Sequence, residues 1–245
     1  MTSRRCFLTL AGGAIFAPSA VFAGDQEKSD VPLVDQVPPL LDHILLGCSD
    51  LERGITFVEQ QTGVRAEFGG VHPGRGTQNA LLSLGTRRYL EIIAPDREQS
   101  GGHSPLLPLL KELADPRLVG WAAHPRNIEA LAAQLKQNGI EATGPTPGSR
   151  KRPDGKVLHW QTLNLKDDAN GLLPFFIEWT AGSLHPSADA PAGCQLLRFE
   201  ILSPDPSALS KLASQLKLEA PIAMARSPQL HAVIKGRGVA LSLTS

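Results

Sequence analysis

The stretch His72–Asn79 reads HPGRGTQN, and it lies between LDHILLG (Leu41–Gly47) and RRYLEIIAPD (Arg87–Asp96). His43 and Glu91 interrupt the two flanking apolar runs, each where an ordinary core strand would carry Val or Leu. Burying an ionisable group in such a run costs several kcal/mol unless a partner or a metal ion satisfies it. The combination predicts a functional site on two strands with a glycine-rich hairpin between them.

Residues 1–23 are typical of an export signal. Arg4-Arg5 is followed by an uncharged run that closes on VFA at Ala23. This pattern predicts a twin-arginine signal peptide cleaved after Ala23, and hence a periplasmic protein. A membrane anchor is the alternative, but the run is short, rich in Gly and Ala and interrupted by Pro18, which disfavours a spanning helix. After cleavage no stable membrane anchor is expected.

The composition excludes one class of partner. Lys and Arg total 24 and Asp and Glu total 24, so the formal net charge is zero. Because there is no basic excess, no nucleic-acid partner is expected. Cys48 and Cys194 follow the predicted signal. A disulfide between them in an oxidising compartment and two buried free thiols are equal alternatives.

One unit of secondary structure repeats along the chain. Residues 24–39 are polar and proline-spaced, which predicts a flexible tether. The first unit then has the order βαβββ. It consists of a strand at 41–48, a helix at 49–63, and strands near 65–68, 79–84 and 89–94.

The unit returns after a short helix that is expected to be capped by Ser104. The second copy has a strand at 118–123, a helix capped by Asn127, and strands near 157–165 and 173–180. Before its last two strands, residues 149–155 (SRKRPDG) predict a basic loop ending in a tight turn. A shorter third copy follows, with a strand at 196–202, a helix from Asp205 and a hairpin over 231–243.

A repeated βαβββ unit with LDH in its first strand and YLEI in its last resembles the vicinal-oxygen-chelate superfamily, which has the glyoxalase fold. HPGRGTQN, RYLEIIAPD, RKRPDG followed by LHW, and LPFFIEW (Leu173–Trp179) are similar to the markers of its glyoxalase-like domain branch. The resemblance implies an α/β (α+β) fold of paired βαβββ glyoxalase-type modules. These modules would span 40–96 and 117–181 of a domain at 40–186, with a partial third βαββ module at 195–245.

The resemblance also implies a site. His43 and Glu91 are expected side by side in a cavity between the modules, and Glu178 matches the last-strand glutamate of the second module. The matching first-strand position is Gly120, which has no side chain that can bind a metal. The implied set is His43, Glu91 and Glu178 on a divalent Zn, Mn, Fe or Ni ion, with open positions for water or substrate.

Each of these residues has an alternative role. His43 can be a core histidine bonded to a neighbour. Glu91 and Glu178 can hold Arg87 or Arg152 in buried ion pairs. Glu178 is flanked by large apolar residues, so it is also a candidate catalytic residue, a carboxylic acid with a raised pKa that transfers protons.

The glycine-rich hairpin supplies candidate substrate-binding residues. Gly74 and Gly76 permit a tight turn or a close backbone approach. This places His72, Thr77 and Asn79 at the mouth of the cavity, and an ordinary glycine hairpin is the alternative.

The basic segment supplies further candidates. Arg150 and Arg152 precede the strand that carries Trp160, which is expected to form part of the cavity wall. The planar fork of arginine suits a carboxylate or a phosphate, so these two arginines are candidate anion-binding residues. A solvated surface loop is the alternative, and His185, in a later polar loop, is given no role.

The expected function is that of an exported, metal-dependent enzyme of the isomerase or lyase type, acting on a small oxygen-rich or anionic metabolite. A metal on His43 and Glu91 would polarise two adjacent oxygens of the substrate. Oxygenation fits least, because the implied set lacks the two-histidine, one-carboxylate arrangement. The alternative function is that of a metal-free protein that binds and sequesters small molecules. Assembly into a homodimer is a separate expectation that the sequence leaves undecided.

Overall fold

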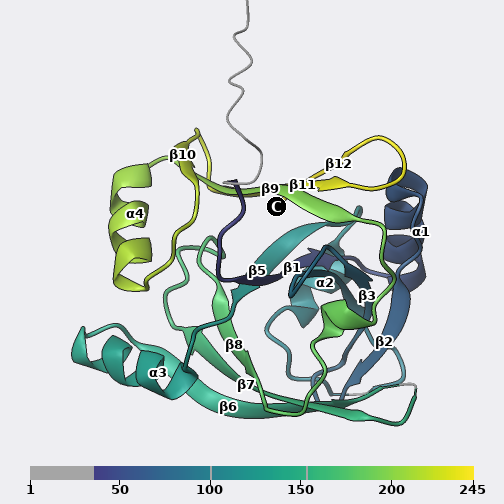
Figure 1. The fold of residues 1–245 in the computed structure, drawn as a ribbon, viewed down its shortest axis with the longest axis horizontal. Coiled ribbons are helices and arrows are strands. Elements are labelled where there is room, and N and C mark those ends of the chain that lie inside the picture. Colours follow the sequence, from purple (N-terminus) through teal and green to yellow (C-terminus); the bar gives the residue numbers. More distant parts are fainter. Residues whose placement is uncertain (1–35, 100, 153) are drawn as a thin grey trace, which may run out of the picture. The chain divides into compact units, whose positions relative to one another are not determined.

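The first module follows the expected βαβββ order. The computed structural model describes residues 36–99, 101–152 and 154–245. The elements are β1 (Leu41–Gly47), α1 (Leu51–Thr62), β2 (Glu67–His72), β3 (Thr77–Ser83) and β4 (Tyr89–Pro95). β1 pairs with β4 in parallel, with Leu45 opposite Glu91. The first and last strands of the module are therefore neighbours. Figure 1 shows α1 and β2 of this module at the right of the view.

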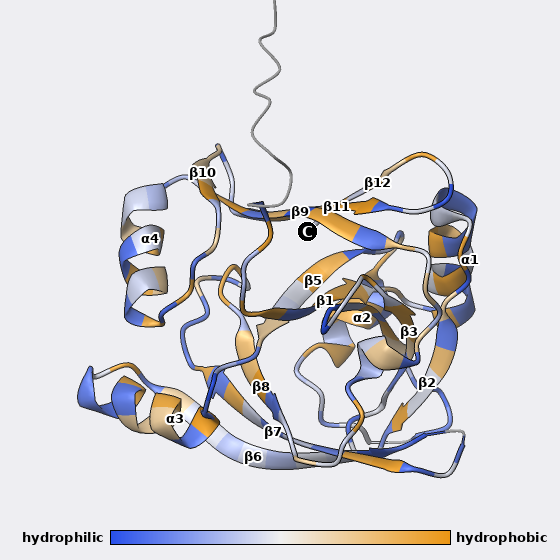
Figure 2. Cartoon of the chain, viewed as in Figure 1, coloured by the Kyte–Doolittle hydropathy of each residue, from blue (hydrophilic) through white to orange (hydrophobic). Residues whose placement is uncertain are grey.

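Local chemistry sets the bounds of α1. The side chain of Asp50 accepts a hydrogen bond from the backbone N–H of Arg53 (3.1 Å) and so caps the start of the helix. Ile55 and Val58 lie on its buried face, and Figure 2 shows hydrophobic and hydrophilic residues on different sides of this helix. Gly63 ends it with a φ of 71°, a left-handed conformation that glycine adopts without strain.

The second module repeats the pattern with one strand more than expected. Its elements are α2 (Leu107–Glu112), β5 (Arg117–Ala123), α3 (Ile128–Gln137), β6 (Ala142–Lys151), β7 (Val157–Leu165) and β8 (Phe175–Trp179). β5 pairs with β8 in parallel, which repeats the pairing of β1 with β4. Leu106 and not the expected Ser104 is the N-cap of α2, with Pro108 in the first turn, and Ser104 Oγ accepts a hydrogen bond from Leu106 N (3.4 Å) just before the helix.

β6 corrects the expected basic loop. Ser149, Arg150 and Lys151 belong to this strand, and Arg150 is only 3% exposed. Pro145 and Pro147 disfavour a strand, because proline has no backbone N–H to donate to a neighbouring strand. They are tolerated here because β6 is the last strand of its sheet and has a hydrogen-bonded neighbour on one side only.

The larger sheet curls until its two edges meet. Its eight strands follow the order β2-β3-β4-β1-β5-β8-β7-β6, and the outer strands β2 and β6 contact each other. Gly69 and Gly70 permit this contact, because a Cβ on Gly69 would lie 2.3 Å from Arg150 Nη1 and one on Gly70 3.0 Å from Lys151 O. The curvature places residues of both modules around one cavity.

The third segment forms a smaller sheet. Its elements are η2 (Pro186–Ala188), β9 (Gln195–Ser203), α4 (Pro206–Gln215), β10 (Ile222–Met224), β11 (Gln229–Lys235) and β12 (Leu241–Thr244). The strands follow the order β10-β9-β11-β12, and β10 is an addition to the expected elements. Phe199 packs against Trp121 with ring centroids 5.1 Å apart, so this sheet shares its core with β5.

The segment before β1 differs partly from the expected tether. The predicted signal peptide and residues 24–35 lie outside the described residues. Val37 belongs to the hydrophobic core, and the carbonyl of Pro38 accepts a hydrogen bond from Leu41 N (3.0 Å). Residues 36–39 are therefore part of the fold. No helix in the described part of the chain is long and apolar enough to cross a membrane.

The cysteines Cys48 and Cys194 are both free and buried. Burial raises the pKa of the Cys48 thiol to about 12, and its Sγ donates a hydrogen bond to Ile93 O (3.5 Å). The structure therefore has the two free thiols and not the disulfide.

Candidate active site

The two modules line a cavity of about 550 Å³. Its polar wall carries His43, His72, Asn79, Glu91 and Arg150, and its apolar walls include Leu45, Trp121, Trp160 and Phe175. A cavity of this size and mixed lining suits one small molecule that a few polar groups orient.

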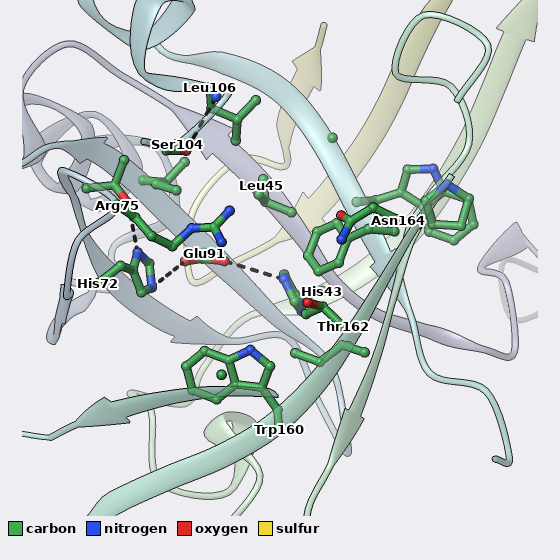
Figure 3. A pocket seen from close by; sticks show the side chains of 18 of the residues that line it. His43, Leu45, His72, Arg75, Glu91, Ser104, Leu106, Trp160, Thr162 and Asn164 are labelled. Atoms are coloured by element: carbon green, nitrogen blue, oxygen red, sulfur yellow. Dashed lines mark hydrogen bonds and ion pairs between the residues drawn. The ribbon is translucent and has the colours of Figure 1, made fainter. Parts of the chain in front are cut away.

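Two imidazoles converge on one carboxylate at the polar wall. His43 Nε2 lies 3.4 Å from Glu91 Oε2, and His72 Nε2 lies 3.7 Å from Glu91 Oε1. Figure 3 shows the two rings on either side of the Glu91 carboxylate. The expected juxtaposition of His43 and Glu91 is confirmed in position, and His72 joins them from β2.

His43 is held from behind by Asp42. The Nδ1 atom of His43 lies 2.8 Å from Asp42 Oδ1, so the Nε2 atom is left facing the cavity. Burial alone lowers the pKa of His43, but the hydrogen bonds to Asp42 and Glu91 outweigh it and raise the pKa to about 9. Burial likewise opposes ionisation of Glu91, but the hydrogen bond and charge of His43 lower the pKa of that carboxyl to about 2.

The hydrogen bonds of the Asn79 amide determine which ring nitrogen of His72 carries the proton. Arg150 Nη1 donates to Asn79 Oδ1 (2.7 Å) and Asn79 Nδ2 donates to Glu91 Oε1 (2.7 Å), so the orientation of the amide is determined. Asn79 Nδ2 also lies 3.3 Å from His72 Nε2, which must therefore accept. His72 Nδ1 then carries the proton and donates to Thr77 Oγ1 (3.0 Å). Burial lowers the pKa of His72, which agrees with a neutral ring.

Glu178 does not join this cluster, and the implied ligand set is corrected. Phe175, Ile177 and Trp179 face the cavity, so Glu178 lies on the opposite face of β8 because side chains alternate along a strand. Its Oε2 accepts a hydrogen bond from Ile128 N at the start of α3 (2.6 Å). In the pairing of β5 with β8, Phe175 lies opposite Ala122, and the odd spacing from Phe175 to Glu178 puts these two side chains on opposite faces of the sheet.

Arg152 also differs from its expected role. Its guanidinium pairs with Asp189 through Nη1, and its Nε lies 3.3 Å from Asp154 Oδ1. It lines a small separate pocket and not the main cavity. Arg150 alone of this pair lines the main cavity, and it also contributes to the wall of the small pocket.

The other predicted contact residues lie in the cavity wall. Thr77 is buried behind His72, and Trp160 faces the cavity from β7. A Cβ on Gly148 would lie 2.4 Å from Trp160 Nε1, so the indole lies over a glycine of β6. Thr77 and Trp160 therefore lie in the cavity wall, as expected. That they bind a substrate stays a prediction.

Two residues lie behind the site, and only one of them had a signal in the sequence. His185 Nε2 lies 3.1 Å from Asp42 Oδ2, although 143 positions separate the two residues. The signal for Asp42 was present, since it is a charged residue inside an apolar run. No local pattern pointed to His185, because its contact forms only when the second module folds against the first.

The donors of the cluster fit a divalent ion chemically. Two imidazole nitrogens and a carboxylate suit Zn, Mn, Fe or Ni, and ligand atoms around a tetrahedral Zn lie about 3.3 Å apart. Within the described residues no three His, Cys, Asp or Glu side chains already form a compact ligand set. His43 Nε2 and His72 Nε2 lie against different oxygens of Glu91, on either side of its carboxylate (Figure 3), so an ion would bind only if these side chains rearranged to bring all three donors together.

The sequence matches the model of the glyoxalase-like domain over residues 41–217. The chain therefore belongs to the glyoxalase-like domain family, and its paired modules have the vicinal-oxygen-chelate fold. No curated protein matches the chain.

The chain is similar to several solved structures. A hypothetical protein from Staphylococcus aureus is 17% identical, with 83% of this chain and 84% of that chain covered and a TM-score of 0.58. A methylmalonyl-CoA epimerase from Mycobacterium tuberculosis is 19% identical, with 59% and 89% covered and a TM-score of 0.43. A Streptomyces coelicolor methylmalonyl-CoA epimerase variant in complex with 2-nitronate-propionyl-CoA is 22% identical, with 60% and 99% covered and a TM-score of 0.44.

Proposed function

We propose that this protein is a divalent-metal-dependent enzyme of the isomerase or lyase type that acts on a small anionic, oxygen-rich metabolite. One observation carries the proposal: His43 and His72 both turn Nε2 toward the two oxygens of Glu91, while an oxygen atom holds each Nδ1. Histidines that bind metal through Nε2 commonly have their other ring nitrogen fixed in this way.

His43, His72 and Glu91 would hold the ion. A bound divalent ion supplies a Lewis acid that polarises adjacent oxygens of a substrate. With His72 in the set, the donors are two histidines and one carboxylate, so the earlier ground for placing oxygenation last no longer holds. Glu178 takes no part in the proposed reaction, because its carboxylate accepts a hydrogen bond from Ile128 N.

Arg150 is the residue proposed to bind the anionic group of the substrate. It is 3% exposed and lines the cavity, and Asn79 holds one of its nitrogens. A buried guanidinium offers planar, paired donors to a carboxylate or phosphate. Trp160 and Phe175 would bind the apolar part of the substrate from the facing wall.

Two further properties are part of the proposal. The twin-arginine pattern supports export to the periplasm, with the signal removed after Ala23. A homodimer is retained as an open option for the assembly. Terminal sequencing of protein recovered from the periplasm tests the export route, and Met1 in the mature pool would contradict it.

Elemental analysis tests the metal. Protein purified without chelator or metal-affinity resin should contain close to one divalent ion per chain, and His43→Ala, His72→Ala and Glu91→Gln should each lose it. Glu178→Gln is the matched control and should keep the ion. If the wild type contains no ion and takes up none of Zn²⁺, Mn²⁺, Fe²⁺ or Ni²⁺, the enzyme proposal fails.

A metal-free binding protein is the second candidate. It is favoured by the ion-paired chain Asp42–His43–Glu91, which satisfies these charges without an ion, and by the aromatic walls of the cavity. In that case small carboxylates should bind equally well with and without a chelator, and a loss of binding in chelator would contradict it.

A further inference from the structure

Asp42 is a buried carboxylate that three N–H groups surround. It is fully buried, and its oxygens lie 2.8 Å from His43 Nδ1, 3.1 Å from His185 Nε2 and 3.2 Å from Trp179 Nε1. A carboxylate in such a place is costly unless donors satisfy it. Its position is therefore determined from three sides.

The direction of each bond follows from chemistry. The backbone N–H of Ser187 donates to His185 Nδ1 (3.2 Å), so this nitrogen accepts and Nε2 carries the proton that goes to Asp42. Trp179 Nε1 can only donate. Since Asp42 accepts from both, it presents a fixed acceptor to His43 Nδ1.

The backbone of β1 is irregular at this point. The register of β1 against β5 shifts between Leu41 and His43, on either side of Asp42. A bulge can re-aim a side chain that strand alternation would turn away. Here it lets consecutive side chains meet, although neighbours along a regular strand point to opposite faces.

We propose that Asp42 is the positioning residue of the site, and that His185 anchors Asp42 so that His43 Nε2 is held toward Glu91. The inference deepens the proposed function and rests on it as far as metal affinity is concerned. Trp179 ends β8 of the second module, His185 lies between β8 and η2, and Asp42 belongs to the first module, so the anchor forms only when these distant parts of the chain are packed together.

Two measurements on the full folded chain test this role. The first is the Nδ1 proton signal of His43 by NMR in metal-free protein, which a carboxylate partner shifts downfield and protects from exchange with water. The second is Zn²⁺ affinity by competition with a chromophoric chelator. Asp42→Asn should move the His43 signal upfield, speed its exchange and weaken Zn²⁺ binding about 10- to 100-fold.

His185 offers a matched pair of variants. His185→Leu removes the donor to Asp42 and should change both readouts in the same direction as Asp42→Asn. His185→Gln keeps a donor near the place of Nε2 and should restore them. The His72 signal should stay unchanged in all variants, because Thr77 and Asn79 hold that ring.

The outcomes separate the two proposals. An unchanged His43 signal and unchanged Zn²⁺ affinity in both Asp42→Asn and His185→Leu would overturn the positioning role. If wild type binds no divalent ion, the enzyme proposal fails and the His43 signal alone decides the role of Asp42. If Asp42→Asn does not fold, the His185→Leu and His185→Gln pair decides it.

Discussion

The hydrogen bond from Arg150 Nη1 to Asn79 Oδ1 (2.7 Å) joins the edge strand β6 to β3, the strand next to the other edge of the curled sheet. Arg150 belongs to β6 of the second module and Asn79 to β3 of the first. The same amide donates to Glu91, so one residue connects the candidate anion-binding arginine to the candidate metal-binding carboxylate. The contact depends on glycine at position 69, where any side chain would meet both partners.

Gly69→Ala is expected to destabilise the protein and to disturb the cavity together. Its Cβ would lie 2.3 Å from Arg150 Nη1 and 2.4 Å from Asn79 Oδ1, and overpacking of this kind costs about 1–3 kcal/mol. Denaturant unfolding measures the loss, and titration of a small carboxylate measures the effect on the cavity.

Gly139→Ala is the control for the Gly69 variant. Its Cβ would have no atom within 4 Å, and its φ of 69° alone should cost about 1–2 kcal/mol. Ligand binding should survive in this control. Equal binding by wild type and Gly69→Ala would show that the edge contact does not shape the cavity.

Arg150→Gln and Arg152→Gln should behave differently, although only one residue separates them. Arg150 lines the main cavity, whereas Arg152 is paired with Asp189 and faces the small pocket. A hydrogen bond to a charged group contributes about 1.5–3 kcal/mol, so Arg150→Gln should weaken binding of a small carboxylate roughly tenfold or more. Calorimetric titration of both variants checks this, and an equal loss in Arg152→Gln would contradict the assignment.

Glu178→Ala should lower stability and leave the cavity unchanged. The carboxylate accepts from Ile128 N at the N-terminus of α3, and loss of such a cap costs about 0.5–2 kcal/mol. Metal content and ligand affinity should equal those of wild type. Loss of a bound ion in this variant would restore Glu178 to the ligand set.

The Cys48 thiol should be unreactive in the folded protein. Burial raises its pKa to about 12, so at pH 8 almost no thiolate is present for alkylation. Iodoacetamide followed by peptide mass spectrometry should modify Cys48 only after unfolding. Rapid labelling of native protein at pH 8 would contradict this environment.

The raised pKa of Cys48 also makes the free energy of unfolding depend on pH. A group with a raised pKa in the folded state contributes stability below its unfolded pKa, and that contribution is lost as pH rises toward the folded value. The free energy of unfolding should therefore fall as pH rises from near 9 toward 12. Cys48→Ala should show a smaller decrease over this range than wild type.

Much of the fold could be predicted from local sequence. The helix expected over 49–63 follows from the spacing of Ile55 and Val58, and the structure places it at Leu51–Thr62. β6 was missed because Pro145 and Pro147 argue against a strand, and only its place at a sheet edge makes them acceptable.

The sequence by itself determined the repeated module and the βαβββ order of its first copy, because these depend on local patterns, and the family resemblance implied the meeting of His43 with Glu91. Tertiary structure alone decided which further side chains reach the cavity. The curl of the sheet brings in His72 and Arg150, the register of β8 turns Glu178 away, and a bulge with a distant histidine fixes Asp42. Such contacts depend on register and closure between distant strands, and a shift of one residue reverses the face on which a side chain lies.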